Sequence, residues 1–292
     1  MNIDRQDIRP AAYAGSWYEG NPDRLKNTIE SYMDEAESTA GLGKIIGIIS
    51  PHAGHMYSGH VAGYAYKHIL GEKYDTVVVV APNHSNPNLN FTSVYTRGGY
   101  ETPLGIIPVD SVAASAIVKY DSSDDIKESD LGHLAGPGDR MEHSLEIQLP
   151  FLQVALGDFK IVPIVMGDRD GGRESCAALG NAIASALEVK NALIVASTDL
   201  SHFHNAETLK EMDSVVSKHI GEYNPEALLR DISSGTCEAC GALPTVAVMI
   251  ACRKLGATEG VVLKMASSGD VSGDYTSAVG YMAAVLTKSD QT

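Results

Sequence analysis

The chain has 292 residues, of which 44% are hydrophobic and 20% charged, so it can bury a substantial core and is neither disordered nor a coiled coil. Its formal net charge of −15 argues against nucleic acid as a partner, because phosphate binding needs clustered Lys and Arg. The sequence has no run of about 18 apolar residues, which argues against a membrane span, and its first ten residues lack the apolar stretch of a signal peptide. We therefore expect a cytoplasmic protein.

Apolar periodicity and Gly/Pro punctuation predict strands that alternate with helices. The predicted elements, in chain order, are a helix over 22–36, a strand over 45–49, a helix over 58–70, strands over 76–81 and 90–96, a helix over 110–120, a polar loop over 122–138, an amphipathic segment over 142–156, a strand over 160–166, a helix over 172–187, a strand over 192–197, helices over 208–220, 225–233 and 241–255, and strands over 260–266 and 276–286. This alternation predicts an α/β fold, a three-layer αβα single domain over 1–292 with a mostly parallel central sheet.

Three of the predicted apolar strands run directly into histidine-bearing loops. The first is followed by His52 and His55, the second by His84, and the third by a segment with Asp199 and His202. In an open α/β sheet, ligands bind beyond the carboxyl ends of the strands, where these loops would meet. The sequence therefore predicts a site at that edge of the sheet.

Converging histidines beside an anionic side chain are typical of metal sites, and imidazole suits Zn, Fe, Cu and Ni. The residues leave three candidates open for the anionic ligand: Asp199, Glu238 and the thiolate of Cys240. Cys240 precedes a predicted helix, whose N-terminus would lower the pKa of the thiol, so we prefer it to Cys237. The two remaining cysteines, Cys176 and Cys252, are expected to be buried thiols, since four cysteines are too few for a disulfide framework.

The sequence contains a series of distinctive motifs in a fixed order. They are AGSWYEG (14–20), PHAGHMYSG (51–59), APNH (81–84), EHSLEIQLPF (142–151), STDLSHF (197–203), CGALP (240–244) and SSGDVSGDYTSAVGY (267–281). Together they resemble the motifs of the Memo family, which is related in fold to class III extradiol ring-cleaving dioxygenases. The resemblance runs nearly from end to end, although His55 stands where the family often has Tyr.

The resemblance implies His52, His84 and Cys240 as metal ligands. It also implies that Asp199 and His202 line the same cleft, with His202 in the place of the dioxygenases' catalytic base. The expected metal is Fe(II), with Cu(I) or Zn as alternatives. The dioxygenases hold iron with two histidines and a glutamate, whereas a softer thiolate here favours Cu(I), Zn or thiolate-bound iron.

Three further residues are expected to bind substrate. His55 is expected close to the metal. His143 and Glu146 lie one turn apart on a predicted helix, which the residues alone leave open as a capped, partly buried surface helix, while the resemblance implies that both face the cleft. The sequence leaves open whether Trp17 covers the cleft or belongs to the core. Prokaryotic relatives often accompany a radical-SAM protein and an AMMECR-like protein, which makes both expected partners.

Three functions are compatible with these residues. The first is a metal-dependent oxidoreductase similar to non-haem dioxygenases, with His202 as acid/base and Asp199 orienting it. The second is a non-catalytic module that binds a peptide or protein in the same cleft. The third is a zinc hydrolase, in which Asp199 or His202 acts as the base.

Overall fold

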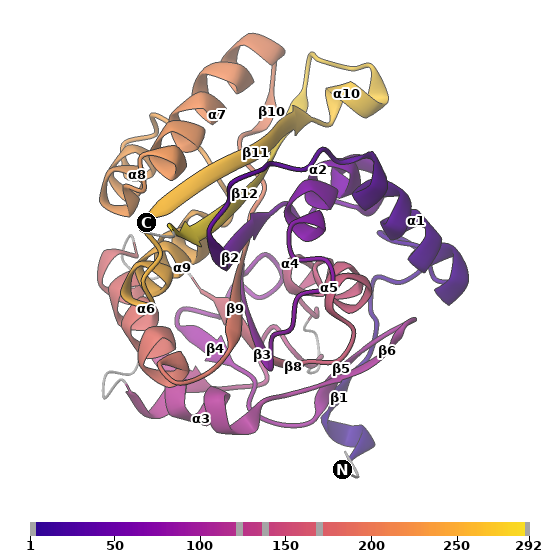
Figure 1. Ribbon diagram of the computed structural model, residues 1–292, viewed down its shortest axis with the longest axis vertical. Coiled ribbons are helices and arrows are strands. Elements are labelled where there is room, and N and C mark those ends of the chain that lie inside the picture. Colours follow the sequence, from indigo (N-terminus) through magenta and orange to yellow (C-terminus); the bar gives the residue numbers. More distant parts are fainter. Residues whose placement is uncertain (1–3, 121–124, 136–139, 168–171, 290–292) are drawn as a thin grey trace.

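The computed structural model describes residues 4–120, 125–135, 140–167 and 172–289, and helices cover both faces of its main sheet (Figure 1). Along this sheet the strand order is β10-β12-β2-β9-β3-β8-β4-β7, and β11 pairs with β12. The strands are β2 (Lys44–Ser50), β3 (Thr76–Pro82), β4 (Thr92–Val94), β7 (Ile126–Glu128), β8 (Lys160–Met166), β9 (Ala192–Ser197), β10 (His202–His204), β11 (Glu259–Ser267) and β12 (Ala278–Lys288).

The centre of the sheet is parallel and its flanks are antiparallel. Strands β2, β9, β3 and β8 run in one direction, with Ser50 opposite Ser197 and Pro82 opposite Met166. Their carboxyl ends therefore meet at one edge. Strand β12 is antiparallel to β2, and β4 is antiparallel to β8, so the sheet is mixed. The predicted three-layer α/β fold is confirmed, and the parallel arrangement holds for its four central strands.

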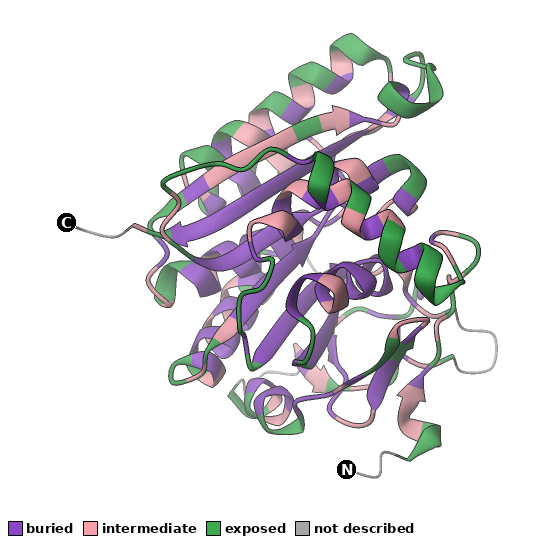
Figure 2. Cartoon of the chain, turned by 45° about the vertical axis from the view of Figure 1, so that its right-hand side comes forward, coloured by how far each residue is buried: buried purple, intermediate pink, exposed green. Residues whose placement is uncertain are grey.

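Two groups of helices form the outer layers. They are α1 (Pro22–Glu35), α2 (His55–Lys67), α3 (Ser111–Tyr120), α4 (His143–Glu146), α5 (Leu149–Leu156), α6 (Arg173–Leu187), α7 (Ala206–Gly221), α8 (Pro225–Ser233), α9 (Ala242–Lys254) and α10 (Gly269–Ser272). Helices α2 and α4 contact the sheet with α1 and α5 packed beside them, while α9 contacts β2, β3 and β9 with α6 and α8 against it. Figure 2 shows buried strands between helices with exposed outer surfaces. None of the described helices is long and apolar enough to cross a membrane.

The sequence patterns missed the shortest elements. A second sheet, β1-β5-β6, consists of β1 (Ile8–Arg9), β5 (Gly99–Thr102) and β6 (Gly105–Pro108), which are too short for a periodic pattern. The segment over 142–156 is two helices, with Pro150 in the first turn of α5. Strand β7 lies within the predicted 122–138 loop, parts of which, 122–124 and 136–138, are outside the described residues.

A buried carboxylate fixes the loop that follows β9. Asp213 of α7 accepts a hydrogen bond from the backbone N–H of Ser201 at 3.0 Å. Ser201 and Leu200 also exchange backbone hydrogen bonds with Gly280 of β12. A Cβ atom at Gly280 would lie 1.8 Å from Asp213 Oδ2, so only glycine allows this approach. The loop that carries Asp199 is thereby attached to β12.

Substitution of Asp213 is expected to change how stability depends on pH. Burial raises the pKa of Asp213 to about 6, so the folded state disfavours the carboxylate. As the pH rises from about 4 to about 6, the free energy of unfolding of the wild type should fall by about 1–3 kcal/mol relative to that of Asp213→Asn. Urea unfolding at several pH values measures this difference. The exposed control Asp34→Asn should show no such trend, and parallel pH profiles for wild type and Asp213→Asn would contradict the expectation.

Candidate metal centre

Three histidines from three separate segments meet beyond the carboxyl ends of the central strands. His52 follows β2, His84 follows β3, and His143 begins α4. One nitrogen from each lies within 4.8 Å of the other two, and this is the group among the described residues that could hold a metal ion. The ring centroids are 5.2 Å apart for His52 and His84 and 4.9 Å apart for His84 and His143.

The hydroxyl group of Ser197 determines which nitrogen of His52 carries the proton. Its oxygen donates to the carbonyl of Ser144 at 2.7 Å, because a carbonyl can only accept. It accepts from Gln148 Nε2 at 2.8 Å, because an amide nitrogen can only donate. The single hydroxyl proton is thus already used, so His52 Nδ1, at 2.9 Å, must donate. This leaves the lone pair of His52 Nε2 free for a metal.

Glu142 orients the imidazole of His84 as Ser197 orients that of His52. Burial raises the pKa of Glu142, but the hydrogen bonds from His84 outweigh this and hold the pKa below its ordinary value. The resulting carboxylate can only accept, so His84 Nδ1 donates to Oε1 at 3.2 Å, and Nε2 is the ring nitrogen left for a metal. His143 Nδ1 lies 3.1 Å from the same oxygen. Glu142 also accepts from the backbone N–H groups of His84 and Ser85, so one buried side chain orients both segments.

The environment keeps two of the imidazoles uncharged. Burial lowers the pKa of His52 well below its ordinary value, and the neighbouring His143 and His84 lower it further. Burial likewise lowers the pKa of His143 to about 4. A metal ion binds the neutral form of imidazole, so protons do not compete for these two residues at neutral pH.

Cys240 contacts this group at His52. Its Sγ lies 3.1 Å from His52 Nε2, the nitrogen with the free lone pair, so the S–H group is the donor. Burial raises the pKa of this thiol, with the nearby Asp199 adding to the effect, so the expected lowering by a helix N-terminus is wrong. Glu238, the carboxylate alternative, is hydrogen-bonded to His204 at 3.0 Å instead.

Asp199 and His202 line the same cleft. Asp199 Oδ1 accepts from the backbone N–H groups of His52 and Ala53, at 2.7 and 3.3 Å, and Oδ2 lies 4.0 Å from His52 Nε2. Burial raises the pKa of Asp199 to about 7, although these two hydrogen bonds oppose it. Burial lowers the pKa of His202. Both groups therefore can exchange protons close to the histidines.

A cleft of about 410 Å³ opens beside the histidines. Its lining residues are Ser16, Trp17, His52, Ala53, Gly54, Met56, Tyr57, His84, His143, Asp199, His202, Val279 and Tyr281. Trp17, which sequence patterns left open, therefore lies on the wall, and its ring centroid is 4.4 Å from that of His143.

The three residues expected to bind substrate lie in different places. His143 lines the cleft. His55 does not line it and is buried against Tyr18 and Phe151, with Nε2 beside the carbonyl of Ile147. Glu146 is also buried outside the lining.

Glu146 holds the N-terminal segment in place. It pairs with Arg9 at 2.5 Å and accepts from the backbone N–H of Tyr13 and the hydroxyl of Tyr18. Trp17 is next to Tyr18, so Glu146 acts on the cleft through the segment that supplies part of its wall.

Glu142, Gln148 and Ser197 support the centre and were missed as site residues. Gln148 bonds to residues that are 49 to 98 positions away along the chain. Glu142 is 58 positions from His84 and 57 from Ser85. The available signals were that Glu142 immediately precedes His143 in EHSLEIQLPF, which also contains Gln148, and that Ser197 begins STDLSHF.

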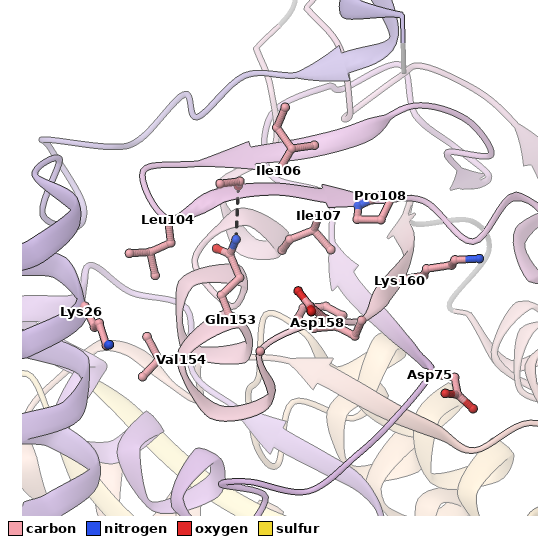
Figure 3. Close-up of a pocket in the computed structure, with 13 residues that line it drawn as sticks. Lys26, Asp75, Leu104, Ile106, Ile107, Pro108, Gln153, Val154, Asp158 and Lys160 are labelled. Atoms are coloured by element: carbon pink, nitrogen blue, oxygen red, sulfur yellow. Dashed lines mark hydrogen bonds between the residues drawn. The ribbon is translucent and has the colours of Figure 1, made fainter. Parts of the chain in front are cut away.

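A larger hollow, of about 770 Å³, lies at the other end of the strands (Figure 3). Lys160 at the start of β8 and Asp75 just before β3 line it, together with Lys26 and Asp158. Among the described residues that line this hollow, none is His or Cys. The chemistry that the histidines can support therefore belongs to the smaller cleft.

The fold and the donor group define an α/β protein with a histidine cluster, able to hold a metal ion, at the carboxyl edge of its sheet. Residues 9–285 match the family model described as Memo-like protein. The chain is 36% identical over 283 residues to a MEMO1 family protein of Methanothermobacter thermautotrophicus, covering 94% of this chain and 98% of the relative. It is 37% identical over 288 residues to one from Aeropyrum pernix, with the same coverage. The chain belongs to the Memo family.

A solved structure supports the fold. The crystal structure of an uncharacterized protein, JW3007 from Escherichia coli K12, aligns with a TM-score of 0.53 and 13% identity. The alignment covers 83% of this chain and all of that one. At this identity the similarity concerns the fold alone.

Removing the Ser197 hydroxyl should weaken metal binding. Ser197→Ala deletes the acceptor for His52 Nδ1–H and leaves the imidazole free to change tautomer, so we expect the Zn²⁺ affinity to fall about 10- to 100-fold. Competition with a chromogenic chelator measures the affinity. Ser201→Ala is the matched control, because no hydrogen bond links that buried hydroxyl to any of the three histidines. Equal affinities in the two variants would contradict the role assigned to Ser197.

Proposed function

We propose that this chain is a metal-dependent oxidoreductase that uses Fe(II) and acts on a small molecule in the cleft. The observation that supports it most strongly is the pair His52 and His84, because a buried acceptor engages the Nδ1–H group of each imidazole and leaves Nε2 for a metal. The residues fit a metal ion, because their other nitrogens are engaged by Ser197 and Glu142 as in known metal sites.

The donor set favours a metal with open coordination positions. His143, within 4.8 Å of the pair, and Cys240, in contact with His52, are the two candidates for a third ligand. Iron bound by three protein ligands would supply O₂ activation, as in non-haem oxygenases. A thiolate from Cys240 would shift the preference towards Cu(I) or Zn.

The chain's own residues supply proton transfer. Asp199 can hold or release a proton near neutral pH, since its pKa is about 7 and its Oδ2 lies 4.0 Å from His52 Nε2. His202, with a lowered pKa, is an uncharged base on the same cleft wall. A general acid and a general base of this kind typically contribute 10²–10⁴-fold to a rate.

One observation favours a second candidate, a zinc hydrolase. The group within 4.8 Å consists of three imidazoles, a donor set that holds catalytic zinc in known enzymes. Asp199 would again be the base.

Metal analysis of protein purified without oxygen tests the shared part of both candidates. We expect about one metal ion per chain in the wild type and almost none in His52→Ala and His84→Ala, because both variants remove a fixed donor. Loss in His143→Ala or in Cys240→Ala identifies the third ligand. His68→Ala is the control, because that imidazole bonds to the backbone of Thr39 and Tyr64 instead.

Stoichiometric metal in both His52→Ala and His84→Ala would overturn the proposal. With a metal bound, the identity of that metal and its response to O₂ separate the two candidates, since both need an open coordination position. The oxidoreductase predicts iron in the protein as isolated and oxidation of the bound Fe(II) when O₂ is admitted. Exclusive retention of zinc and an iron form that does not react with O₂ would favour the hydrolase.

A further inference from the structure

The described part of the cleft wall contains acidic and neutral polar groups and histidines. Among the described residues that line it, none is Lys or Arg. Arg9, a buried cation behind the N-terminal segment, is already paired with Glu146. Asp199 and, behind the histidines, Glu142 are the buried carboxylates closest to this chemistry, and the whole chain carries a net charge of −15. A second anionic group on a ligand would therefore have no Lys or Arg partner among these residues.

Three backbone N–H groups at the cleft are also occupied by groups of the protein. The N–H groups of His52 and Ala53 point at Asp199 Oδ1. The N–H of His55, at the start of α2, donates to the carbonyl of Trp17 at 2.8 Å. At the N–H groups of His52 and Ala53, a carboxylate of the protein thus fills the position that a substrate carboxylate or phosphate would otherwise take.

Apolar and aromatic side chains make up the rest of the lining. Trp17 stands on one side, and Met56 and Tyr57, in the first turn of α2, are exposed at 61% and 40%. Val279 and Tyr281 come from β12. Aromatic rings and a flexible methionine suit a flat apolar body, and a volume of about 410 Å³ is in the range of small-molecule sites.

We infer that the cleft takes a ligand with a single anionic or hydroxyl group, which binds the metal, and an uncharged aromatic or apolar body, which lies against Trp17, Met56 and Tyr57. This inference rests on the proposed metal site and adds the class of substrate. It excludes ligands whose body carries a carboxylate or a phosphate.

Trp17 makes the test direct. It is the chain's single tryptophan and its ring lies 4.4 Å from that of His143, so its fluorescence reports on both metal and ligand. The Zn²⁺-loaded full chain is titrated with benzohydroxamate and with 4-carboxybenzohydroxamate, which share a metal-binding head and differ in the charge of the body. We expect benzohydroxamate to bind at least about tenfold more tightly, the usual effect of leaving one charged group without a partner.

A charge added at the rim provides the second arm. Met56→Lys gives the carboxylate a partner and should reduce the preference at least about threefold, as expected for an exposed ion pair. Val189→Lys, at a 96% exposed position in the turn before β9, should leave the preference unchanged.

The outcomes separate the two proposals. Failure of Zn²⁺ to bind would overturn the proposed function and the inference with it. Zn²⁺ binding with equal or tighter binding of the carboxylated probe, or with no binding of either probe, would overturn only the substrate class. A preference that is unchanged in Met56→Lys would place the discrimination outside the cleft and would also overturn it.

Discussion

The candidate site depends on the hydroxyl group of Ser197, which donates one hydrogen bond and accepts two. This residue ends β9, and its oxygen has three partners: the carbonyl of Ser144, the amide of Gln148 and the imidazole of His52. Gln148 is fixed in turn, because its Nε2 also donates to the carbonyl of Pro51 and its Oε1 accepts from Tyr66. The end of β2, the end of β9 and the α4–α5 junction are thus joined around one oxygen. A fully satisfied buried network of this kind is rigid, which a metal site requires.

Three buried carboxylates organise the segments around that point. Glu142 binds the loop after β3, Glu146 binds the N-terminal segment, and Asp199 binds the loop after β2. Burying a carboxylate without partners is costly, but each of these accepts at least two hydrogen bonds from backbone N–H groups or charged donors. Some of the acidic residues of the chain are therefore buried. Asp199 and Glu142 lie beside the histidines and accept hydrogen bonds that orient them.

The long elements could be predicted from the sequence, because apolar runs such as TVVVVA must be buried on both faces. So could the position of His52, His84 and Asp199, since the carboxyl ends of parallel strands meet at one edge. The place of His143 beside them depends on α4 contacting β3 and β8, which no local pattern encodes. His55 was expected near the metal, but the first turn of α2 turns it into the core and presents Met56 and Tyr57 instead, a difference of one or two helical positions.

The central claim is that the surrounding hydrogen bonds fix His52 with its proton on Nδ1 and its lone pair on Nε2. Long-range ¹H–¹⁵N correlation spectra of the metal-free protein, with labelled histidine and His52→Ala for assignment, observe the two ring nitrogens separately. The account predicts a protonated Nδ1 and an unprotonated Nε2 at neutral pH, with the Nε2 resonance shifting when Zn²⁺ is added. A proton on Nε2, or a doubly protonated ring, would contradict it.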